Sequence, residues 1–299
     1  YVVFLYHIFY NQSMKNFFYL FFCLSLASFG QNTLIPDSNF EQALIDLGID
    51  TNLIIDGQVL TADVLGVTQL NVNSKNITDL TGIEDFTALS YLDCAGNQLT
   101  SLDVSNNVVL SELRCNFNQI TSLNISNNST LEELFANNNQ LTSLDVTNCA
   151  ALNVLIVSTN QLTSLDLSNN VVLTRLIISD NQFTSININN NTALIYLDCS
   201  VNQLNSLDVT NNIALTDIEC FLNQITSLDL SNNSALEELG ASNNQLTSLD
   251  VTNNTALQYL YCGNNQLTSL DIRNGNNENI SGFNTTNNLN LSCIRLLFF

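Results

Sequence analysis

Apolar residues alternate with polar ones in short stretches along most of this chain. In SLDV, Leu102 and Val104 are apolar and their neighbours are polar, and in ELRC the same holds for Leu113 and Cys115. A two-residue alternation predicts a β-strand that buries one face. The polar runs between these stretches are rich in asparagine, which is typical of turns.

The stretches repeat with a fixed period. The dipeptide Asn-Gln recurs every 21 residues, with its glutamine at Gln98, Gln119, Gln140, Gln161, Gln182, Gln203, Gln224, Gln245 and Gln266. Each unit has one half of the form L-x-x-L-x-C-x-x-N and a second half of the form L-T-S-L-D-V-S-N-N. Such a period predicts a solenoid, whose coils stack their strands in parallel about 4.8 Å apart. We expect the asparagines to bond the backbone at the corners.

These units resemble leucine-rich repeats, L-x-x-L-x-L-x-x-N, and in particular the 21-residue class with a nested second half found in secreted proteins of Bacteroidota. The resemblance covers about residues 67–288. It implies a mainly β fold, a leucine-rich-repeat solenoid of 21-residue coils with parallel β ladders and a short N-terminal helical cap. It also implies that the first strand of each coil forms the ligand-facing sheet.

Residues 31–66 are expected to form that cap. Ser38 and Glu41 have the spacing of a capping box, and Gly48 is placed to end the helix. Four apolar residues fall on one helical face, where they would cover the open end of the first coil; they are Phe40, Ala43, Leu44 and Leu47.

The two ends of the sequence carry further expectations. Residues 14–30 have a lysine, an apolar run, and small residues at Ser28 and Gly30, which is the pattern of a secretory signal peptide. The alternative is a membrane anchor, for which the run is short. Residues 1–13 would then be non-native translation upstream of the start, and residues 289–299 a truncated end without a sorting domain.

The charge of the chain indicates which classes of partner it is expected not to bind. The sequence has 27 acidic and six basic residues, a formal net charge of −21. Nucleic acids and anionic membranes are recognised through basic patches, so neither is an expected partner. We expect no stable membrane insertion after the signal is removed.

The sequence lacks the residues that several kinds of catalysis require. The single histidine, His7, lies before Met14, which excludes Ser-His-Asp and Cys-His catalysis from the mature chain. The sequence has no glycine-rich phosphate loop and no C-x-x-C. Carboxylate pairs serve glycosidases, but a regular solenoid offers no deep cleft for them. We predict a protein that is not an enzyme and that needs no cofactor.

The cysteines follow the repeat. In other coils their position is held by Ala, Val or Ile, which indicates a small inward apolar slot. Neighbouring coils would allow a disulfide by distance, but parallel side chains in register are poorly aimed for one. We predict buried free thiols at Cys94, Cys115, Cys199, Cys220 and Cys262. The redox state of Cys149 and Cys293 stays open.

One column of the second half is acidic. It contains Asp103, Asp145, Asp166, Asp208, Asp229, Asp250 and Asp271, with Asn124 and Asn187 in the same position. A calcium ladder is one interpretation, although calcium sites need several converging oxygens. A solvated outer face is the other interpretation, and it is the one we predict, with no metal site.

The outward positions of the first half vary from coil to coil, whereas those of the second half hardly change. A varied row of aromatic, aliphatic and charged side chains is typical of a protein-binding face. The candidate ligand-binding residues are Tyr91, Asp93, Glu112, Arg114, Glu133, Phe135, Val154, Ile156, Arg175, Ile177, Tyr196, Asp198, Asp217, Glu219, Tyr259 and Tyr261.

Two functions fit this pattern. The first is a secreted or cell-surface binding module that recognises a protein through the apolar group Phe135, Val154, Ile156 and Ile177, or a glycan through an aromatic and acidic cluster of Tyr196, Asp198, Tyr259 and Tyr261. The second is a structural spacer or adhesin stalk, in which the variation reflects only the lack of constraint on an exposed surface.

Overall fold

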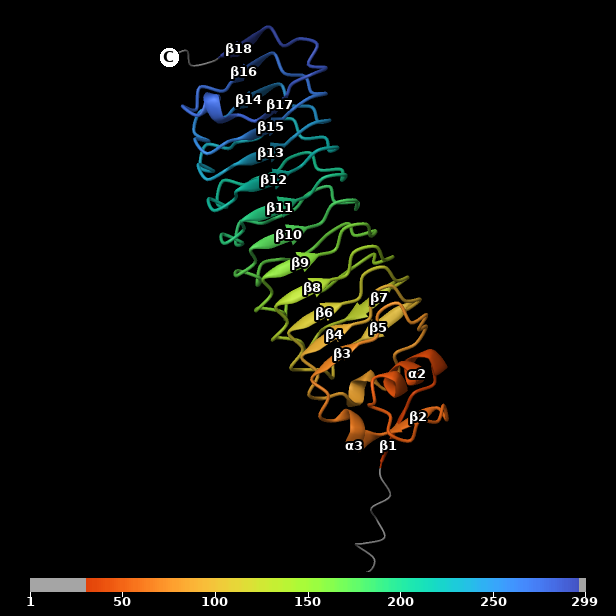
Figure 1. The fold of residues 1–299 in the computed structure, drawn as a ribbon. Coiled ribbons are helices and arrows are strands. Elements are labelled where there is room, and N and C mark those ends of the chain that lie inside the picture. The colour runs from red at the N-terminus through yellow and green to blue at the C-terminus, as the bar shows by residue number, and fades with distance from the viewer. Residues whose placement is uncertain (1–30, 296–299) are drawn as a thin grey trace, which may run out of the picture.

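The computed structural model describes residues 31–295. The predicted signal peptide with Cys23, the segment 1–13 and the last four residues lie outside the described residues. Residues 67–295 coil into an elongated solenoid of about eleven turns, and the N-terminal elements close one end of it (Figure 1). The predicted fold, a mainly β solenoid of 21-residue coils with parallel ladders, is confirmed.

One strand from each coil enters an 11-stranded parallel sheet, which we call the main sheet. Its strands are paired in register, so that equivalent residues of successive coils form straight columns. In chain order they are β3 (Gln69–Asn71), β4 (Tyr91–Asp93), β6 (Glu112–Arg114), β8 (Glu133–Phe135), β9 (Val154–Ile156), β10 (Arg175–Ile177), β11 (Tyr196–Asp198), β12 (Asp217–Glu219), β13 (Glu238–Gly240), β15 (Tyr259–Tyr261) and β17 (Gly282–Asn284).

The second halves of the coils form a less regular side. Strands pair only near the two ends of the solenoid, as β5 (Ser101–Asp103) with β7 (Ser122–Asn124), and as β14 (Ser248–Asp250) with β16 (Ser269–Asp271) and β18 (Cys293–Arg295). In the five coils between, these segments form no strand ladder, although the alternation of the second half predicts a strand there too. The alternation buries every second side chain. A ladder also requires backbone hydrogen bonds between neighbouring strands, and only the main sheet keeps them in every coil.

A single apolar core runs the length of the solenoid. The central residue of each main-sheet strand from β3 to β15 points inward, as Leu155 and Leu176 do, and both are fully buried. On β17, at the end of the sheet, the central Phe283 is 43% exposed. Phe40 of the cap meets Phe86 of the first coil with ring centroids 6.3 Å apart, which joins the core to the N-terminal elements.

Two columns of buried asparagines hold the corners. Asn181 shows the first column: its Nδ2 donates to the carbonyls of Val157 and Ile178, and its Oδ1 accepts from Leu162 N at 2.9 Å. In the second column the Nδ2 donates to two carbonyls of the preceding coil, as Asn170 does to Val146 and Cys149. The predicted role of these asparagines is therefore confirmed.

The backbone turns to positive φ once per coil, just before the asparagine of the first column. This position holds Gly96 in one coil, but Val201 with φ 52° and Thr159 with φ 54° in others. The left-handed region disfavours β-branched side chains, so the repeat geometry overrides local preference at these residues.

The cap contains more than a helix. An antiparallel pair, β1 (Asn32–Leu34) and β2 (Gln58–Leu60), lies beside α2 (Ser38–Asp46), and two short helices follow, α3 (Thr61–Val64) and η1 (Ile83–Asp85). Another 3-10 turn, η2 (Asn277–Asn279), lies near the far end. None of the helices within residues 31–295 is long and apolar enough to span a membrane.

The predicted capping box is wrong. Asp37, not Ser38, caps α2, since its Oδ1 accepts from the backbone of Asn39 and Phe40. Glu41 does not turn back to the helix; it is buried and accepts from the backbone of 56–58. The helix ends before Gly48, at φ 70°, as predicted.

Three of the four predicted apolar positions of the helix are buried. The exception is Leu47, which is 50% exposed.

The thiols occupy the predicted apolar slot. All five cysteines of the column are buried and unbridged, and so is Cys149 in the second asparagine column, whereas Cys293 is exposed. Burial raises the pKa of Cys115, Cys220 and Cys262 to about 12. A thiol with such a pKa is almost entirely protonated at neutral pH and therefore a poor nucleophile.

We expect a thiol reagent such as Ellman's reagent to modify Cys293 quickly in the native protein. The six buried thiols, in contrast, should react only when the protein opens, and they should all become accessible in denaturant. The Cys293→Ser variant should leave almost no fast phase. A mass consistent with a Cys94–Cys115 disulfide would contradict the burial of these residues as free thiols.

Candidate functional site

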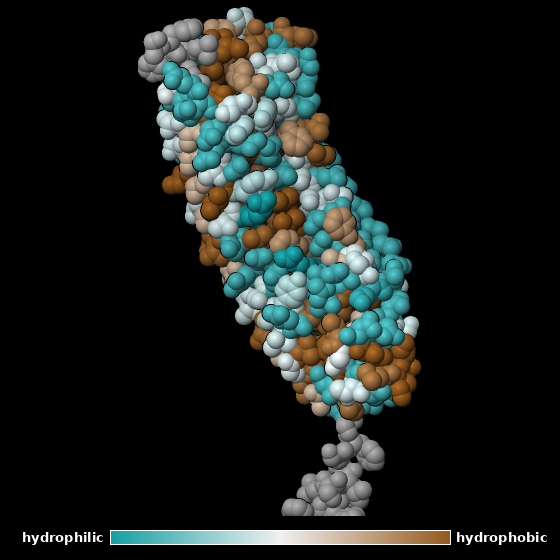
Figure 2. All heavy atoms as spheres, in the orientation of Figure 1, coloured by the Kyte–Doolittle hydropathy of each residue, from teal (hydrophilic) through white to brown (hydrophobic). Residues whose placement is uncertain are grey.

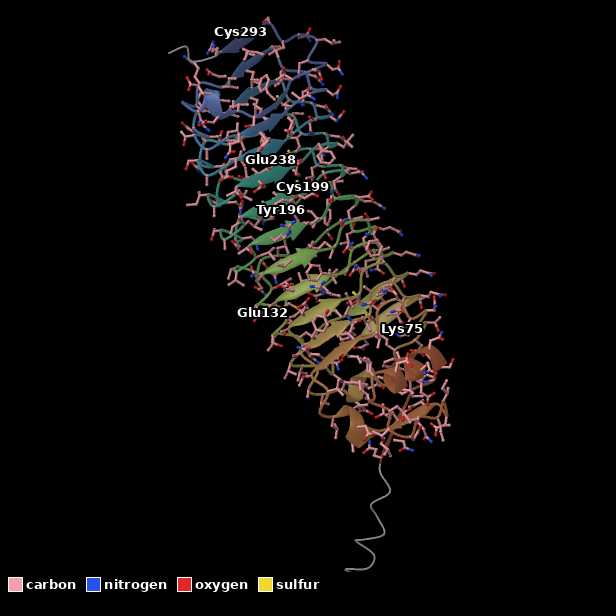
Figure 3. The ribbon with its side chains drawn as sticks, in the orientation of Figure 1. Lys75, Glu132, Tyr196, Cys199, Glu238 and Cys293 are labelled. Atoms are coloured by element: carbon pink, nitrogen blue, oxygen red, sulfur yellow. The ribbon has the colours of Figure 1, made fainter. Side chains whose placement is uncertain are left out.

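The main sheet presents two outward columns, from the first and third residue of each strand. All sixteen candidate residues of the sequence analysis lie in these columns, on strands β4 to β15. Most are half-buried between their neighbours, while Arg175 and Tyr259 are exposed and Asp93 is buried, 9% exposed. Figure 3 labels Tyr196 and Glu238 on this sheet. The columns thus form one continuous surface, which we call the outer sheet face.

The centre of the outer sheet face is apolar. Phe135, Ile156 and Ile177 are direct neighbours in register on β8, β9 and β10, and Val154 lies in the adjacent column. Figure 2 shows an apolar area over β9 and β10 with polar areas around it. The apolar group predicted from the sequence is therefore contiguous.

Both arginines of this face lie over aromatic rings of the next coil. The Arg114 guanidinium lies 4.7 Å from the ring centroid of Phe135, and that of Arg175 lies 4.1 Å from the centroid of Tyr196. Arg114 also pairs with Glu112 at 2.5 Å. Stacking of this kind holds a long side chain in place and reduces the entropy that it would lose on binding.

The C-terminal half of the face is acidic. Asp198 is the register neighbour of Glu219, and Asp217 is that of Glu238. Glu219 leans over Gly240, where an added methyl group would overlap its carboxylate. Burial first, and then the charges of Glu238, Asp198 and Asp217, raise the pKa of Glu219 to about 7.

The predicted aromatic and acidic cluster is not one cluster. Tyr196 and Asp198 lie on β11, whereas Tyr259 and Tyr261 lie on β15, with β12 and β13 between them. Three strand spacings amount to about 14 Å. The two tyrosines lean instead over Gly282, on the side away from the carboxylates. A single small sugar would not contact both pairs.

A second apolar area was missed by the sequence analysis. It lies at the turns that lead into the main sheet and comprises Val171, Val172, Ile195 and Ile213, which are 46–61% exposed. Apolar side chains are visible along this border beside β10 to β12 (Figure 2). Most other coils place polar residues or alanine at the same turn positions, so a comparison of turns between coils would have found it.

Each aspartate of the acidic column in the second half closes a turn of its own backbone. In each of its seven aspartates, Oδ1 accepts from the backbone N–H two residues further on. For Asp145 and Asp208, the threonine hydroxyl at that position and then its N–H hold the pKa of the carboxyl below its usual value. These bonds account for the aspartates structurally. Within residues 31–295, no three His, Cys, Asp or Glu side chains are placed to share a metal ion.

We expect salt to raise the melting temperature by screening this column, whichever cation is used. Sodium chloride and calcium chloride at equal ionic strength should therefore act alike in a thermal unfolding experiment. The Asp208→Asn variant should respond slightly less to both salts. A rise specific to millimolar calcium would favour the calcium ladder instead.

Comparison with known proteins gives a consistent picture of the fold. Residues 234–294 match the family described as leucine-rich repeats in two copies. No curated protein matches the sequence. Among solved structures, a leucine-rich repeat protein of Leptospira interrogans is 25% identical with a TM-score of 0.65, over 77% of this chain and 60% of that one.

Two further structures are similar. The leucine-rich repeat domain of APL1B is 27% identical with a TM-score of 0.60, over 71% of this chain and 69% of that one. YopM from Yersinia enterocolitica is 24% identical with a TM-score of 0.60, over 77% of this chain and 47% of that one. This chain thus spans less than two thirds of the Leptospira protein and about half of YopM.

Proposed function

We propose that this leucine-rich-repeat solenoid is a secreted or cell-surface recognition module that binds a protein through the outer sheet face. The observation that carries the proposal is the contiguous apolar group Phe135, Val154, Ile156 and Ile177, bordered by stacked arginines and by carboxylates. An apolar centre with a charged border is the usual anatomy of a protein contact.

The shape of the face supports a protein rather than a small molecule. Its side chains stand on a regular sheet and are spread over many coils, so a partner can contact several of them at once. Leucine-rich repeats commonly mediate protein–protein interaction. Catalysis, a cofactor and nucleic-acid binding are not part of the proposal, since the sequence after Met14 has no histidine and its acidic residues far outnumber its basic ones.

A structural spacer is the second candidate. The uniform second half of the coils, with its aspartate turns, would suit a stiff rod. A spacer, however, gives no reason for apolar side chains to gather at the centre of one face and at the adjoining turns, where they are partly exposed to water.

Two double variants test the proposal. Phe135→Ser with Ile156→Ser removes the apolar centre, and Tyr259→Ser with Tyr261→Ser changes the same sheet about five strands away. All four side chains point outward, so either pair should leave folding nearly intact, which circular dichroism would verify. The test is capture of a partner from the native environment, followed by measurement of its affinity.

We expect the first pair to weaken binding at least tenfold, because residues at the centre of an interface carry most of its energy. The second pair should have the smaller effect if a protein is bound, and the larger one if a glycan is bound by the tyrosines. Binding that survives both pairs would place the site off this sheet and would contradict the proposal.

A further inference from the structure

Two carboxylates in the acidic half of the outer sheet face, those of Glu219 and Glu238, are not explained by the fold. Those of Asp198 and Asp217 accept hydrogen bonds from Ser200 and from the Thr216 hydroxyl. Asp198 faces Glu219, and Asp217 faces Glu238, as direct neighbours on parallel strands. Like charges in such positions destabilise a sheet. No salt bridge or hydrogen bond within residues 31–295 reaches the carboxylate of Glu219 or Glu238. Their charge therefore costs stability and gains no partner within the fold.

The basic residues of the solenoid are used elsewhere. Lys75 pairs with Asp46, Arg114 with Glu112, and Arg273 and Arg295 both with Asp271. Arg175 stacks on Tyr196, at the border between the apolar centre and the carboxylates. None of these side chains thus forms a salt bridge with a carboxylate of β11 to β13.

The acidic half continues directly from the apolar centre. Ile177 on β10 is the register neighbour of Asp198 on β11, and Arg175 is that of Tyr196. A partner that covers Ile156 and Ile177 would therefore bring its adjacent residues over the four carboxylates. A metal ion is the less suitable occupant, because no group of three acidic side chains in the described chain is placed to coordinate one.

We infer that the contact segment of the partner protein carries arginine or lysine next to apolar side chains, with the basic groups over β11 to β13 and the apolar ones over Ile156 and Ile177. This inference rests on the proposed function and specifies the chemistry of the partner. Arginine fits best, because its planar group can bridge two carboxylates with paired hydrogen bonds.

The half-buried position of Glu219 is consistent with this inference. Its carboxylate lies over Gly240 beside three other acids, and at neutral pH it is protonated in part of the molecules. A bound guanidinium would favour its charged form and would remove the repulsion from Asp198, Asp217 and Glu238.

The test uses two short fluorescein-labelled peptides, one with leucine and arginine and one in which citrulline, a neutral isostere, replaces each arginine. Affinity is measured by fluorescence anisotropy at about 0.15 M salt, where distant charges are screened. Two variants of the whole chain replace the same number of acidic residues by their amides. Glu219→Gln with Glu238→Gln alters the outer sheet face, and Asp208→Asn with Asp229→Asn alters the opposite side of the coils.

We expect the arginine peptide to bind the unmodified protein about tenfold more tightly than its citrulline twin, as two partly desolvated charge pairs would provide. The glutamine pair should remove most of this difference, and the asparagine pair should leave it. Equal losses in both variants would show a response to overall charge and would overturn the inference, as would equal affinity of the two peptides.

Failure of this inference can be told apart from failure of the proposed function. If Phe135→Ser with Ile156→Ser weakens a captured partner while the glutamine pair does not, the sheet binds a protein whose contact is not basic. If neither pair has an effect on that partner, the proposed function itself is wrong.

Discussion

Replacement of Asn181 by alanine is expected to lower the free energy of unfolding by about 3–5 kcal/mol, the largest effect that we predict for a single substitution. The side chain is 9% exposed and makes bonds in both directions. Its loss leaves the N–H of Leu162 in the preceding coil without a partner. It also removes one of the two amide donors to the carbonyl of Val157, the other being Asn160. A buried polar group without a partner costs about 1–3 kcal/mol.

The measurement is urea unfolding followed by circular dichroism. In a solenoid each coil contacts only its neighbours, so a weak joint in the middle can also split one transition into two. Asn211→Ala is the matched control, because Asn211 is an exposed asparagine at a corner of the following coil; it should change the free energy by less than about 0.5 kcal/mol.

A third variant identifies the group responsible. Asn181→Asp keeps an oxygen that can accept from Leu162 but loses the donor to the carbonyls of Val157 and Ile178. It should therefore also be strongly destabilising. A stability close to that of the unmodified protein in both Asn181 variants would show that the asparagine column does not join the coils.

Replacement of Gly82 by alanine should cost about 3 kcal/mol and should act mainly at the cap. Gly82 has φ 103°, a region that is essentially closed to other residues, and an added methyl carbon would lie 2.5 Å from the carbonyl oxygen of Leu34. It would also overlap the side chain of Ile35, which is fully buried. The first coil and β1 cannot both keep their positions around a larger residue.

Hydrogen exchange would locate this effect. The amides of α2 should lose protection in Gly82→Ala, while those of the central main sheet should change little, since distant coils are only weakly coupled. Gly66→Ala is the control: Gly66 is exposed, and an added methyl carbon would have no heavy atom within 4 Å. Equal exchange in the two variants would show that the cap does not pack on Gly82.

The outcome of the capping box shows where sequence reasoning fails. Ser38 and Glu41 have the right spacing, yet Asp37 caps the helix, and its second oxygen accepts from the backbone and hydroxyl of Thr78, 41 residues further on. Glu41 instead serves the backbone of 56–58. Local motifs compete with contacts from distant segments, which a sequence does not display.

The period of 21 residues determined most of this protein by itself. A repeated pattern forces the same burial in every coil, so the inward leucines, the thiol slot, the asparagine columns and the two outward columns of the main sheet all followed from counting. These features depend on short-range rules that each coil obeys in the same way.

Only the tertiary structure decided which side chains of neighbouring coils contact one another. Because Gly240 has no side chain, the carboxylate of Glu219 lies over it, among other acidic side chains. The register of the columns places Arg175 over Tyr196 and separates Tyr196 from Tyr259. The ladder of the second half also breaks in the middle coils. These outcomes depend on side-chain direction and backbone spacing across coils, which the identity of single residues does not encode.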